Sequence, residues 1–337
     1  MFGALRLVLA AMVALSHVGV SMRGYHLGVP AVVVFLLLSG YVVAAMLHTH
    51  PGGWSSPRLF YAERAVRLLP PYYVAWLLGL AAFYTAGMSS PFVSGWQQPA
   101  LWLASLLVVP LNFAAVAPVL DTFTPVPPAW SLGLELQFYL LAPWLLASTR
   151  RMLGALVLTW VVGATAQLGL LPSDAWGYRL LPGNLWIFLL GSCLFHALQR
   201  SNGCCARALR LVWLVTLALW LWTAAVGRWG QPFVAEVLGG VVLGLPAVAV
   251  LARLPRRAWD DRMADWAYPV FLVHFAVIAT AWPTLQQLPH ATGWVVYLAL
   301  VWVLAWWLDR VAQRPVARWR RHLRARQSAI LGQPATP

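Results

Sequence analysis

Charged side chains are scarce in this chain of 337 residues, and their scarcity excludes an ordinary soluble domain. Only 9% of the residues are charged and 61% are hydrophobic, whereas about 25% are charged in a typical soluble domain. The mean hydropathy is +0.72. Because water could not keep such a surface in solution, the solvent of this protein must be lipid. The composition therefore predicts an integral membrane protein that crosses a bilayer many times.

Lysine is absent from the chain. All 23 basic residues are arginine and only 9 residues are acidic, which gives a formal net charge of +14. A basic excess can indicate nucleic-acid binding, but the sequence has no DNA- or RNA-binding motif. The arginines gather instead between apolar runs and in the C-terminal tail, as they do in the cytoplasmic loops of membrane proteins. We therefore expect the lipid bilayer, and no nucleic acid, as a partner.

Cysteine patterns and cofactor motifs are also missing. The 3 cysteines show no CxxC or Cys/His spacing, so the sequence predicts neither a disulfide framework nor a metal site. Cys204 and Cys205 are expected in a basic loop. No Walker loop, GxGxxG, HExxH or GxSxG motif occurs, and ATP-driven transport, nicotinamide chemistry and metalloproteolysis therefore have no support. We expect no metal and no bound cofactor.

Apolar segments of membrane-spanning length recur along the whole chain. Segments of roughly 17–20 residues can cross a hydrocarbon core of about 30 Å. They do not alternate as the strands of a membrane barrel would, so we expect an all-α polytopic membrane protein. The first has no small-x-small cleavage site and is expected to remain as an uncleaved span. Eleven such segments run near 5–22, 28–47, 70–87, 100–116, 129–147, 152–171, 180–199, 209–226, 233–252, 265–283 and 292–310.

Arginines then orient these segments. The loop 48–69, the loops after the fifth, seventh and ninth segments, and the tail are all basic and are expected to be cytoplasmic. Two cytoplasmic loops need an even number of crossings between them. However, three segments separate the loop 48–69 from the loop after the fifth segment. The weakest of the three, 100–116, is interpreted as re-entrant or non-spanning. About ten transmembrane helices remain, with both termini cytoplasmic, in a membrane domain 1–312 followed by a short basic cytoplasmic tail 313–337.

Ionisable side chains inside these spans are costly, so each is a functional candidate. His17, about 18 Å into the first span, suits a general base or a nucleophile that accepts an acyl group; the alternative is a histidine hydrogen-bonded between helices. Glu135 suits the support of a histidine, or a carboxylate held by arginine or aromatic donors. For His274 alone, packing is the simpler interpretation. Glu236 lies where we expect water to reach it and is a weak candidate.

Arg64 and Arg67 are three residues apart, on what we expect to be a short helix ahead of Pro70 and Pro71. This spacing places both guanidiniums on one helix face. Such a pair suits bidentate binding of phosphates. From spacing alone, ordinary positive-inside charges explain the pair better.

Six motifs, taken in order, resemble those of the acyltransferase 3 family of bacterial membrane O-acyltransferases. The fourth is the most specific, and together they cover roughly residues 3–310. Leu136 and Ile187 stand where acidic residues are frequent in that family. The motifs are Arg6 with His17, Val34–Tyr41 (VFLLLSGY), Arg64–Tyr72 (RAVRLLPPY), Trp130–Tyr139 (WSLGLELQFY), Phe188–Gly191 (FLLG) and Tyr268–His274 (YPVFLVH).

The resemblance implies an enzyme that takes an acyl group, expected to be acetyl, from acyl-CoA on the cytoplasmic side. The group would pass to a hydroxyl of a carbohydrate or lipid-linked glycan of the envelope or of an exported polysaccharide. The resemblance also implies that His17 is the catalytic histidine, that Glu135 supports the site, and that Arg64 and Arg67 hold the phosphates of the co-substrate acyl-CoA. Further residues expected to bind substrate or acyl-CoA are Ser39, Trp130, Ser131, Tyr139 and His274.

Two mechanisms and a second function stay open. His17 either deprotonates the acceptor hydroxyl or is itself acylated first. The alternative function is a transporter or flippase of a glycan or lipid-linked substrate, because transporters also place polar groups mid-membrane. The sequence shows one interrupted segment and no internal repeat, which favours the enzyme, and a non-catalytic scaffold would not explain the costly charges. The expected location is the bacterial inner membrane.

Overall fold

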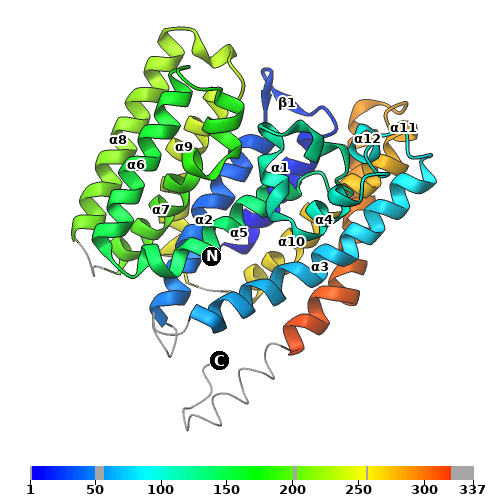
Figure 1. Ribbon diagram of the computed structural model, residues 1–337, viewed down its shortest axis with the longest axis horizontal. Coiled ribbons are helices and arrows are strands. Elements are labelled where there is room, and N and C mark those ends of the chain that lie inside the picture. The colour runs from blue at the N-terminus through cyan, green and yellow to red at the C-terminus, as the bar shows by residue number, and fades with distance from the viewer. Residues whose placement is uncertain (1, 50–56, 200–202, 256, 320–337) are drawn as a thin grey trace.

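The computed structural model describes residues 2–49, 57–199, 203–255 and 257–319 (Figure 1). The predicted tail 313–337 is therefore described only as far as residue 319, and its remainder lies outside the described residues. The α-helices are α1 (Gly3–Ser16), α2 (Gly28–Thr49), α3 (Pro57–Thr85), α4 (Pro99–Leu107), α5 (Ala129–Leu146), α6 (Thr149–Gln167), α7 (Leu181–Leu198), α8 (Gly203–Ala225), α9 (Val234–Ala252), α10 (Ala258–Thr280), α11 (Trp282–Leu285) and α12 (His290–Leu308).

Short elements connect these helices. Strands β1 (Ser21–Met22) and β2 (Tyr25–His26) pair antiparallel into a small hairpin between α1 and α2. The remaining elements are the 3-10 turns η2 (Pro91–Val93), η3 (Val109–Ala115), η4 (Pro118–Thr122) and η6 (Arg228–Gly230), and the π-turns η5 (Ala175–Arg179) and η7 (Asp309–Gln313).

Within the described ranges, 7 helical stretches are long and apolar enough to cross a membrane. They contain α2, α3, α7, α8, α9, α10 and α12. The helical class is therefore confirmed. Helices α1, α5 and α6 stand outside this set, so the count of ten spans stays a prediction, as does the side of the membrane on which the termini lie.

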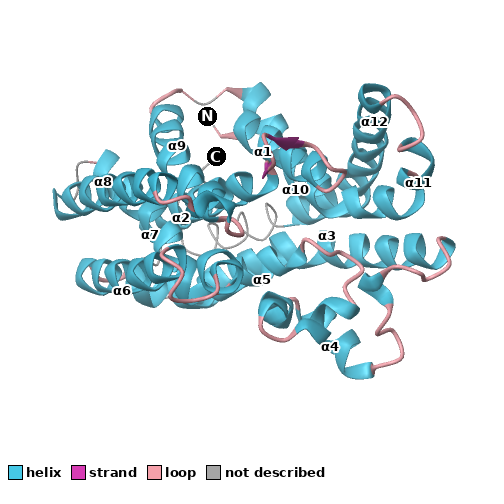
Figure 2. Ribbon diagram, turned by 90° about the horizontal axis from the view of Figure 1, so that it is seen from above, coloured by secondary structure: helices cyan, strands magenta, loops and turns pink. Residues whose placement is uncertain are grey.

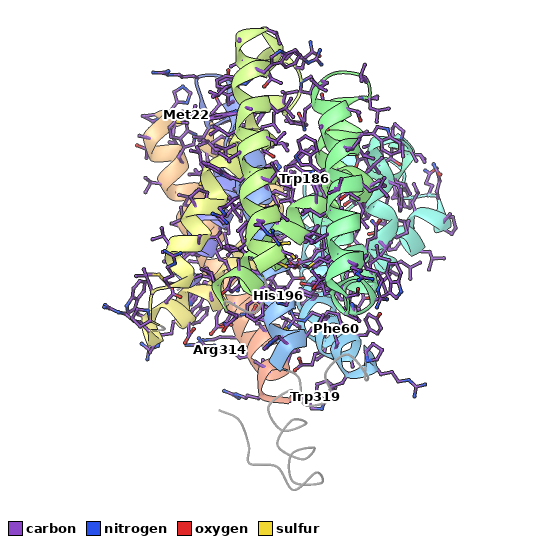
Figure 3. All side chains as sticks on the ribbon, turned by 90° about the vertical axis from the view of Figure 1, so that its left-hand side faces the viewer. Met22, Phe60, Trp186, His196, Arg314 and Trp319 are labelled. Carbon is purple, nitrogen blue, oxygen red and sulfur yellow. The ribbon has the colours of Figure 1, made fainter. Side chains whose placement is uncertain are left out.

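Seen from above, the helical bundle is elongated rather than round (Figure 2). In this view, α6 and α8 lie at one end of the bundle and α11 and α12 at the other, with α3 and α4 along one side (Figure 2). In side view, Met22 of the hairpin lies near the top, whereas Phe60, His196, Arg314 and Trp319 lie toward the bottom (Figure 3). We call the end of the bundle marked by Met22 the hairpin end, and the end marked by Arg314 the basic end.

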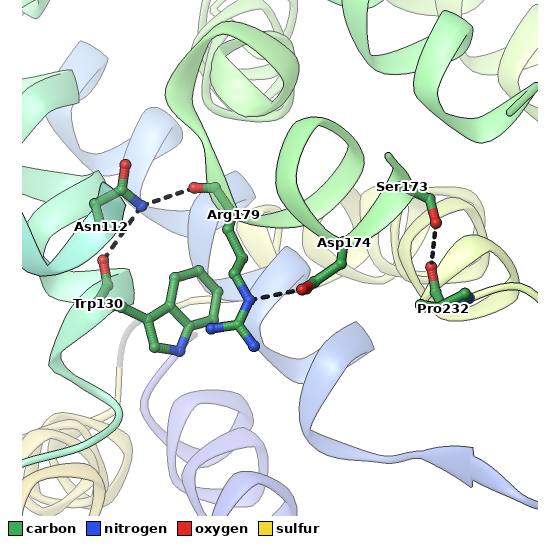
Figure 4. A network of polar contacts seen from close by, with 6 residues as sticks. All are labelled: Asn112, Trp130, Ser173, Asp174, Arg179 and Pro232. Atoms are coloured by element: carbon green, nitrogen blue, oxygen red, sulfur yellow. Dashed lines mark hydrogen bonds and ion pairs between the residues drawn. The ribbon is translucent and has the colours of Figure 1, made fainter. Parts of the chain in front are cut away.

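Segment 100–116 does not form one long helix. Its helix α4 has 9 residues, about 14 Å, against a hydrocarbon core of about 30 Å. Val108 ends α4 with a positive φ of 65°. Asn112 is only 1% exposed, and its side-chain amide donates to the backbone carbonyls of Trp130 and Arg179 (Figure 4). Asn112 therefore ties this segment to α5 and η5, and α4 is too short to cross the core, consistent with a non-spanning role.

Helix α3 differs from the prediction because it is one continuous helix of 29 residues that includes both adjacent prolines. Arg64 and Arg67 accordingly belong to this long helix, and the expected separate short helix is wrong. Membrane helices tolerate proline where neighbouring helices cover the weakened stretch. Here the Tyr268 hydroxyl of α10 donates to the Leu68 carbonyl at 2.9 Å. Apolar runs mark only the membrane-embedded part of a helix, and a helix can extend beyond its run. Cys204 and Cys205 accordingly belong to α8 rather than to a loop.

The first helix is shorter than the predicted span 5–22. It ends one residue before His17, which forms its C-terminal cap and is exposed. Gly19 and Gly24 then adopt positive φ values of 86° and 87°, a conformation that glycine adopts without steric cost. These turns redirect the chain into the hairpin. The expectation that His17 lies within the helix is therefore wrong.

Helix α10 begins seven residues earlier than the predicted residue 265, at Ala258. Asp260 in its first turn is 4% exposed. Its carboxylate accepts hydrogen bonds from the backbone N–H groups of Gly3 and Ala4, each at 2.9 Å. The Asp260 carboxylate therefore caps the N-terminus of α1 and complements the dipole of α1. Helices α1 and α10 therefore start at the same level, and this alignment determines the position of the histidines described below.

Two glycines allow α2 and α7 to approach closely. A Cβ atom on Gly40 would lie 1.8 Å from the Phe188 carbonyl oxygen, and one on Gly191 would lie 2.0 Å from the Leu37 carbonyl oxygen. Small residues are favoured at such contacts in membranes because they let the two backbones pack together.

We expect Gly191→Ala to destabilise the protein by about 1–3 kcal/mol, the usual cost of overpacking, and to lower its melting temperature in detergent. Gly154→Ala in α6 is the matched control, because a Cβ atom there meets nothing within 4 Å. Alanine is also the better helix former, so the control should keep or raise the melting temperature. A Gly191→Ala protein that melts with the wild type would contradict the close α2–α7 packing.

Candidate functional site

Three arginines line a cavity between α1, α2, α3, α5 and α10. Arg6 comes from α1, and Arg64 and Arg67 come from α3. Arg64 is 4% exposed. We call this space the arginine cavity. It brings together three guanidiniums that are far apart in the sequence, because α1 and α3 both pack against α10.

Glu135 is the one carboxylate among the described residues that line the arginine cavity. The Ser39 hydroxyl donates to Glu135 Oε1 at 2.6 Å, and the Tyr139 hydroxyl donates to the same oxygen. The Arg64 guanidinium lies over the Tyr139 ring, 5.6 Å from its centroid. The carboxylate is thus held by two hydroxyl groups. The ion pairs formed within the described ranges, Arg179–Asp174 and Arg314–Asp309, lie elsewhere.

The arginine cavity carries more positive than negative charge, since three guanidiniums face one carboxylate. Arg64 Nε is buried and has no hydrogen-bond partner among the described residues. Arg64 Nη2 lies 2.6 Å from Met46 Sδ, and a thioether is a weak acceptor. Uncompensated buried charge costs several kcal/mol, so a bound anion would stabilise this arrangement. Arginine pairs are well suited to phosphate because of their bidentate geometry.

The arginine cavity is elongated along the helices. Its lining residues on α2 extend from Val42 to Val32, ten residues or about 15 Å. On α10 it reaches Phe271. The Phe271 carbonyl accepts a hydrogen bond from His274 Nδ1 at 2.7 Å. One end of the arginine cavity therefore lies within a helical turn of a buried histidine.

His17 and His274 contact each other at the hairpin end of α1 and α10. His17 lies fourteen residues after Gly3, and His274 lies fourteen residues after Asp260, which caps that same glycine. Both are therefore about 21 Å along their helices from the Gly3–Asp260 contact. His274 Nε2 lies 3.3 Å from His17 Nδ1, and the ring centroids are 5.2 Å apart. His274 is fully buried, whereas His17 is exposed.

The hydrogen bonds of this pair define which nitrogens carry protons. A carbonyl oxygen only accepts, so His274 Nδ1 donates to the Phe271 carbonyl and its Nε2 carries the lone pair when the ring is neutral. His17 Nδ1 lies 2.8 Å from the Val13 carbonyl and donates in the same way, also facing His274 Nε2. His17 Nε2 is then the unprotonated nitrogen. This tautomer gives His17 a free lone pair for proton transfer or nucleophilic attack.

His17 opens onto a hollow at the hairpin end. We call it the His17 hollow; it is lined by Val18 and Gly19, which follow His17, by α11 with the residues after it, and by the start of α12. It is separate from the arginine cavity, since the two share no lining residue. His17 therefore lies between an exposed hollow and, through His274, the inner end of an elongated cavity.

The structure separates the predicted site residues into two groups. Glu135 lies with Ser39, Tyr139 and the arginines, and its hydrogen bonds go to hydroxyl groups rather than to a histidine. Ser131 also lines the arginine cavity. His274 lies with His17. The hypothesis of a carboxylate that orients His17 directly therefore has no contact to support it.

Trp130 does not line either space. Its ring lies under the Arg179 guanidinium at 5.1 Å and edge-on to Tyr178 at 5.0 Å. Figure 4 shows Trp130 beside Arg179, which also pairs with Asp174 at 2.8 Å. Trp130 therefore packs the hairpin side of α5 against η5.

Two residues of the arginine cavity were not among the expected site residues. Arg6 and Tyr268 line the arginine cavity, although only a motif resemblance had marked them, since neither is unusual in spacing or context. Glu236 is 9% exposed, so the expectation that water reaches it is wrong. Its carboxylate accepts a hydrogen bond from the His26 backbone N–H at 3.2 Å. Glu236 thereby anchors the hairpin that follows His17.

A family model and two relatives match the chain. Residues 2–310 match the acyltransferase 3 family, described as an acyltransferase domain. The chain is 26% identical over 352 residues to Nodulation protein 10 of Rhizobium leguminosarum bv. viciae, covering 91% of this chain and 86% of that protein. It is 34% identical over 167 residues to an uncharacterized protein of Aquifex aeolicus, covering 47% of this chain and 74% of that protein. No solved structure matches the chain.

Proposed function

Because the chain belongs to the acyltransferase 3 family, we propose that this membrane acyltransferase moves an acyl group from acyl-CoA to a glycan hydroxyl. The acyl group is acetyl in the simplest case, and the glycan belongs to the envelope or to an exported polysaccharide. One observation carries the proposal: the arginine cavity, the His17–His274 pair and the His17 hollow follow one another along α1 and α10.

The donor end of this arrangement is the arginine cavity. The arginine cavity has an excess of positive charge. Its arginines, Arg6, Arg64 and Arg67, would therefore bind the phosphates of acyl-CoA. From Arg6 to His17 the rise along α1 is about 16 Å, a distance of the order of an extended pantetheine arm. The cavity extends in that direction as far as Phe271, below His274. The thioester would therefore reach the histidine pair while the nucleotide stays with the arginines.

The chemical step uses His17 Nε2. In direct transfer, His17 Nε2 takes the proton of the acceptor hydroxyl while the hydroxyl oxygen attacks the thioester carbonyl carbon. The new carbon–oxygen bond forms, the carbon–sulfur bond breaks, and the CoA thiolate leaves and is protonated by the His17 imidazolium. His274 keeps the Nδ1 proton of His17 in place by accepting from it. Proton transfer by a positioned histidine contributes about 10²–10⁴-fold to rate.

The second mechanism begins with attack of His17 Nε2 on the thioester itself. CoA leaves first, and the acylated imidazole then passes the acyl group to the glycan hydroxyl, which loses its proton as the histidine is regenerated. Both mechanisms need the same tautomer. Mass spectrometry of protein incubated with acyl-CoA alone distinguishes them, because only the second adds an acyl group to the peptide that contains His17.

The polarity of the chain supports a direction of transfer. Arg314 follows α12 at the basic end (Figure 3), and Arg150 and Arg151 lie in the first turn of α6. Cytoplasmic segments of membrane proteins are rich in arginine, so we place the basic end in the cytoplasm and the His17 hollow at the outer face of the bacterial inner membrane. CoA would then stay inside, and only the acyl group would cross.

The test uses purified protein in detergent with acetyl-CoA labelled in the acetyl group. Envelope glycans are added as acceptor, and we measure both released CoA and label in the glycan. The proposal expects label in the glycan, with one CoA released per acetyl group. No transfer from acetyl-, propionyl- or longer acyl-CoAs would contradict it. Glycan movement into vesicles without an acyl donor would then favour a transporter or flippase.

A further inference from the structure

The His17 hollow has an unusual combination of side chains for the end of a membrane bundle. Trp282 and Trp294 contribute indole rings, and Gln286 and His290 contribute neutral polar groups beside His17. The described residues that line it include no arginine, aspartate or glutamate. The hollow therefore offers flat apolar surfaces and hydrogen-bonding groups, but no fixed charge for an ionic ligand.

The aromatic residues of the His17 hollow are held in place. The Trp282 ring packs edge-on against Tyr297 at 5.6 Å. Tyr297 is fully buried, and its hydroxyl donates to the Ala14 carbonyl of α1 at 3.2 Å. Trp294 stacks with His290 at 5.9 Å. The helix that carries His17 and the two tryptophans are therefore linked through packed side chains.

Gly293 shapes the floor of the His17 hollow. A Cβ atom at this position would lie 2.8 Å from the Leu285 carbonyl oxygen. The glycine thus lets the start of α12 approach α11 closely, with Leu285 buried between them. Close approach brings Gln286 and Trp294, which come from opposite sides of the connecting turn, to one hollow.

We propose that the His17 hollow is the acceptor subsite and that it binds an uncharged sugar ring. Trp282 and Trp294 cover the faces of the ring, Gln286 and His290 hydrogen-bond its hydroxyls, and one hydroxyl reaches His17 Nε2. Binding sites for small ligands combine apolar walls with a few polar groups that fix orientation in this way. The inference rests on the proposed function and adds to it the position and chemistry of the acceptor.

Interfacial tryptophans alone would not indicate this site, because membrane proteins commonly place them at the level of the lipid headgroups. The distinguishing feature is the position of Gln286 and His290, which line the same hollow as the exposed His17. A purely anchoring role for the tryptophans does not require these polar groups. The neutral lining also favours a sugar ring over a phosphate or carboxylate.

The test compares adjacent glutamines. Gln286 lines the hollow and Gln287 does not. Otherwise the two are alike: both are exposed, and the side-chain amide of each donates to the Pro283 carbonyl, at 3.4 Å from Gln286 Nε2 and 3.3 Å from Gln287 Nε2. Gln286→Ala and Trp294→Ala should raise the half-saturating glycan concentration, by about threefold to tenfold for the amide and by about tenfold or more for the aromatic anchor. Gln287→Ala should match the wild type.

Two acceptor preparations are used with labelled acetyl-CoA: delipidated envelope polysaccharide, and an organic-solvent extract of lipid-linked sugars. The preparation that the wild type labels identifies the source of the sugar ring. The KM for acetyl-CoA and the melting temperature should be unchanged in Gln286→Ala, and Trp294→Phe should partly restore glycan affinity if the Trp294→Ala protein is unstable. Unchanged half-saturation in both variants, or an equal change in Gln287→Ala, would overturn the acceptor subsite alone.

Failure of the proposed function gives a different result. In that case the wild type labels neither preparation, and the acceptor subsite falls with the glycan acceptor itself. Labelling by the wild type with normal glycan affinity in the hollow variants instead leaves the acyltransferase function intact and moves the acceptor elsewhere.

Discussion

His17→Ala is expected to lower the rate of acyl transfer by roughly 10²- to 10⁴-fold, the range that a positioned proton-transfer group contributes. The reason is that His17 Nε2 is the free nitrogen of the exposed histidine at the junction of the two spaces. Initial rates of acetyl transfer to glycan at saturating acetyl-CoA measure the effect. An acylated His17 intermediate would make the loss at least as large.

The control for this variant is His48→Ala. His48 is also exposed, but it lies in the last turn of α2, away from the His17 hollow. It should keep the wild-type rate, and both proteins should melt as the wild type does. Wild-type turnover in His17→Ala would contradict both mechanisms at once, because each uses the same nitrogen.

His274→Ala is expected to have a smaller effect, about tenfold on kcat. The Val13 carbonyl still accepts from His17 Nδ1 after His274 is removed, so one of the two contacts that hold the tautomer remains. His274→Gln should recover part of the rate, because its amide oxygen can accept from His17 Nδ1. A merely structural role would instead show as a fall in melting temperature that both substitutions share.

Arg64→Gln is expected to raise the KM for acetyl-CoA by about 10- to 100-fold, with a smaller change in kcat. A hydrogen bond to a charged group contributes about 1.5–3 kcal/mol, and Arg64 is the most buried of the cavity arginines. Initial rates at varied acetyl-CoA and fixed glycan give the KM. Arg67→Gln should act in the same direction.

Arg58→Gln is the matched control on the same helix, because Arg58 is exposed and does not line the arginine cavity. The comparison removes the same charge in each case and isolates position. If Arg58→Gln raises the KM as much as Arg64→Gln, the effect reflects overall charge and the arginine cavity is not the donor site.

The helical class and the approximate positions of the long helices could be predicted from the sequence because long apolar runs identify stretches able to cross a membrane. Their ends could not be predicted in the same way. Helix α10 extends seven residues beyond its apolar run, and α1 stops before the end of its own run because Gly19 and Gly24 turn the chain. Cap and turn geometry, which hydropathy does not contain, determines both ends.

The candidate site shows the same limit. The sequence marks His17, Glu135 and His274 as candidates inside spans, yet only the two histidines meet. Their contact depends on the Asp260 cap, which aligns the starts of α1 and α10. Glu135 instead joins Ser39 of α2. Sequence spacing gives the height of a residue along one helix, but the neighbours of that helix come from the packing of the whole bundle.

The central claim is that an acyl group passes from the arginine cavity to the His17 hollow while CoA stays on the donor side. Proteoliposomes with oriented protein test it directly, with labelled acetyl-CoA on one face only and envelope glycan on one face only. We predict labelled glycan when acetyl-CoA is supplied at the basic end and glycan at the hairpin end. Labelling only when donor and acceptor share one face would contradict the account.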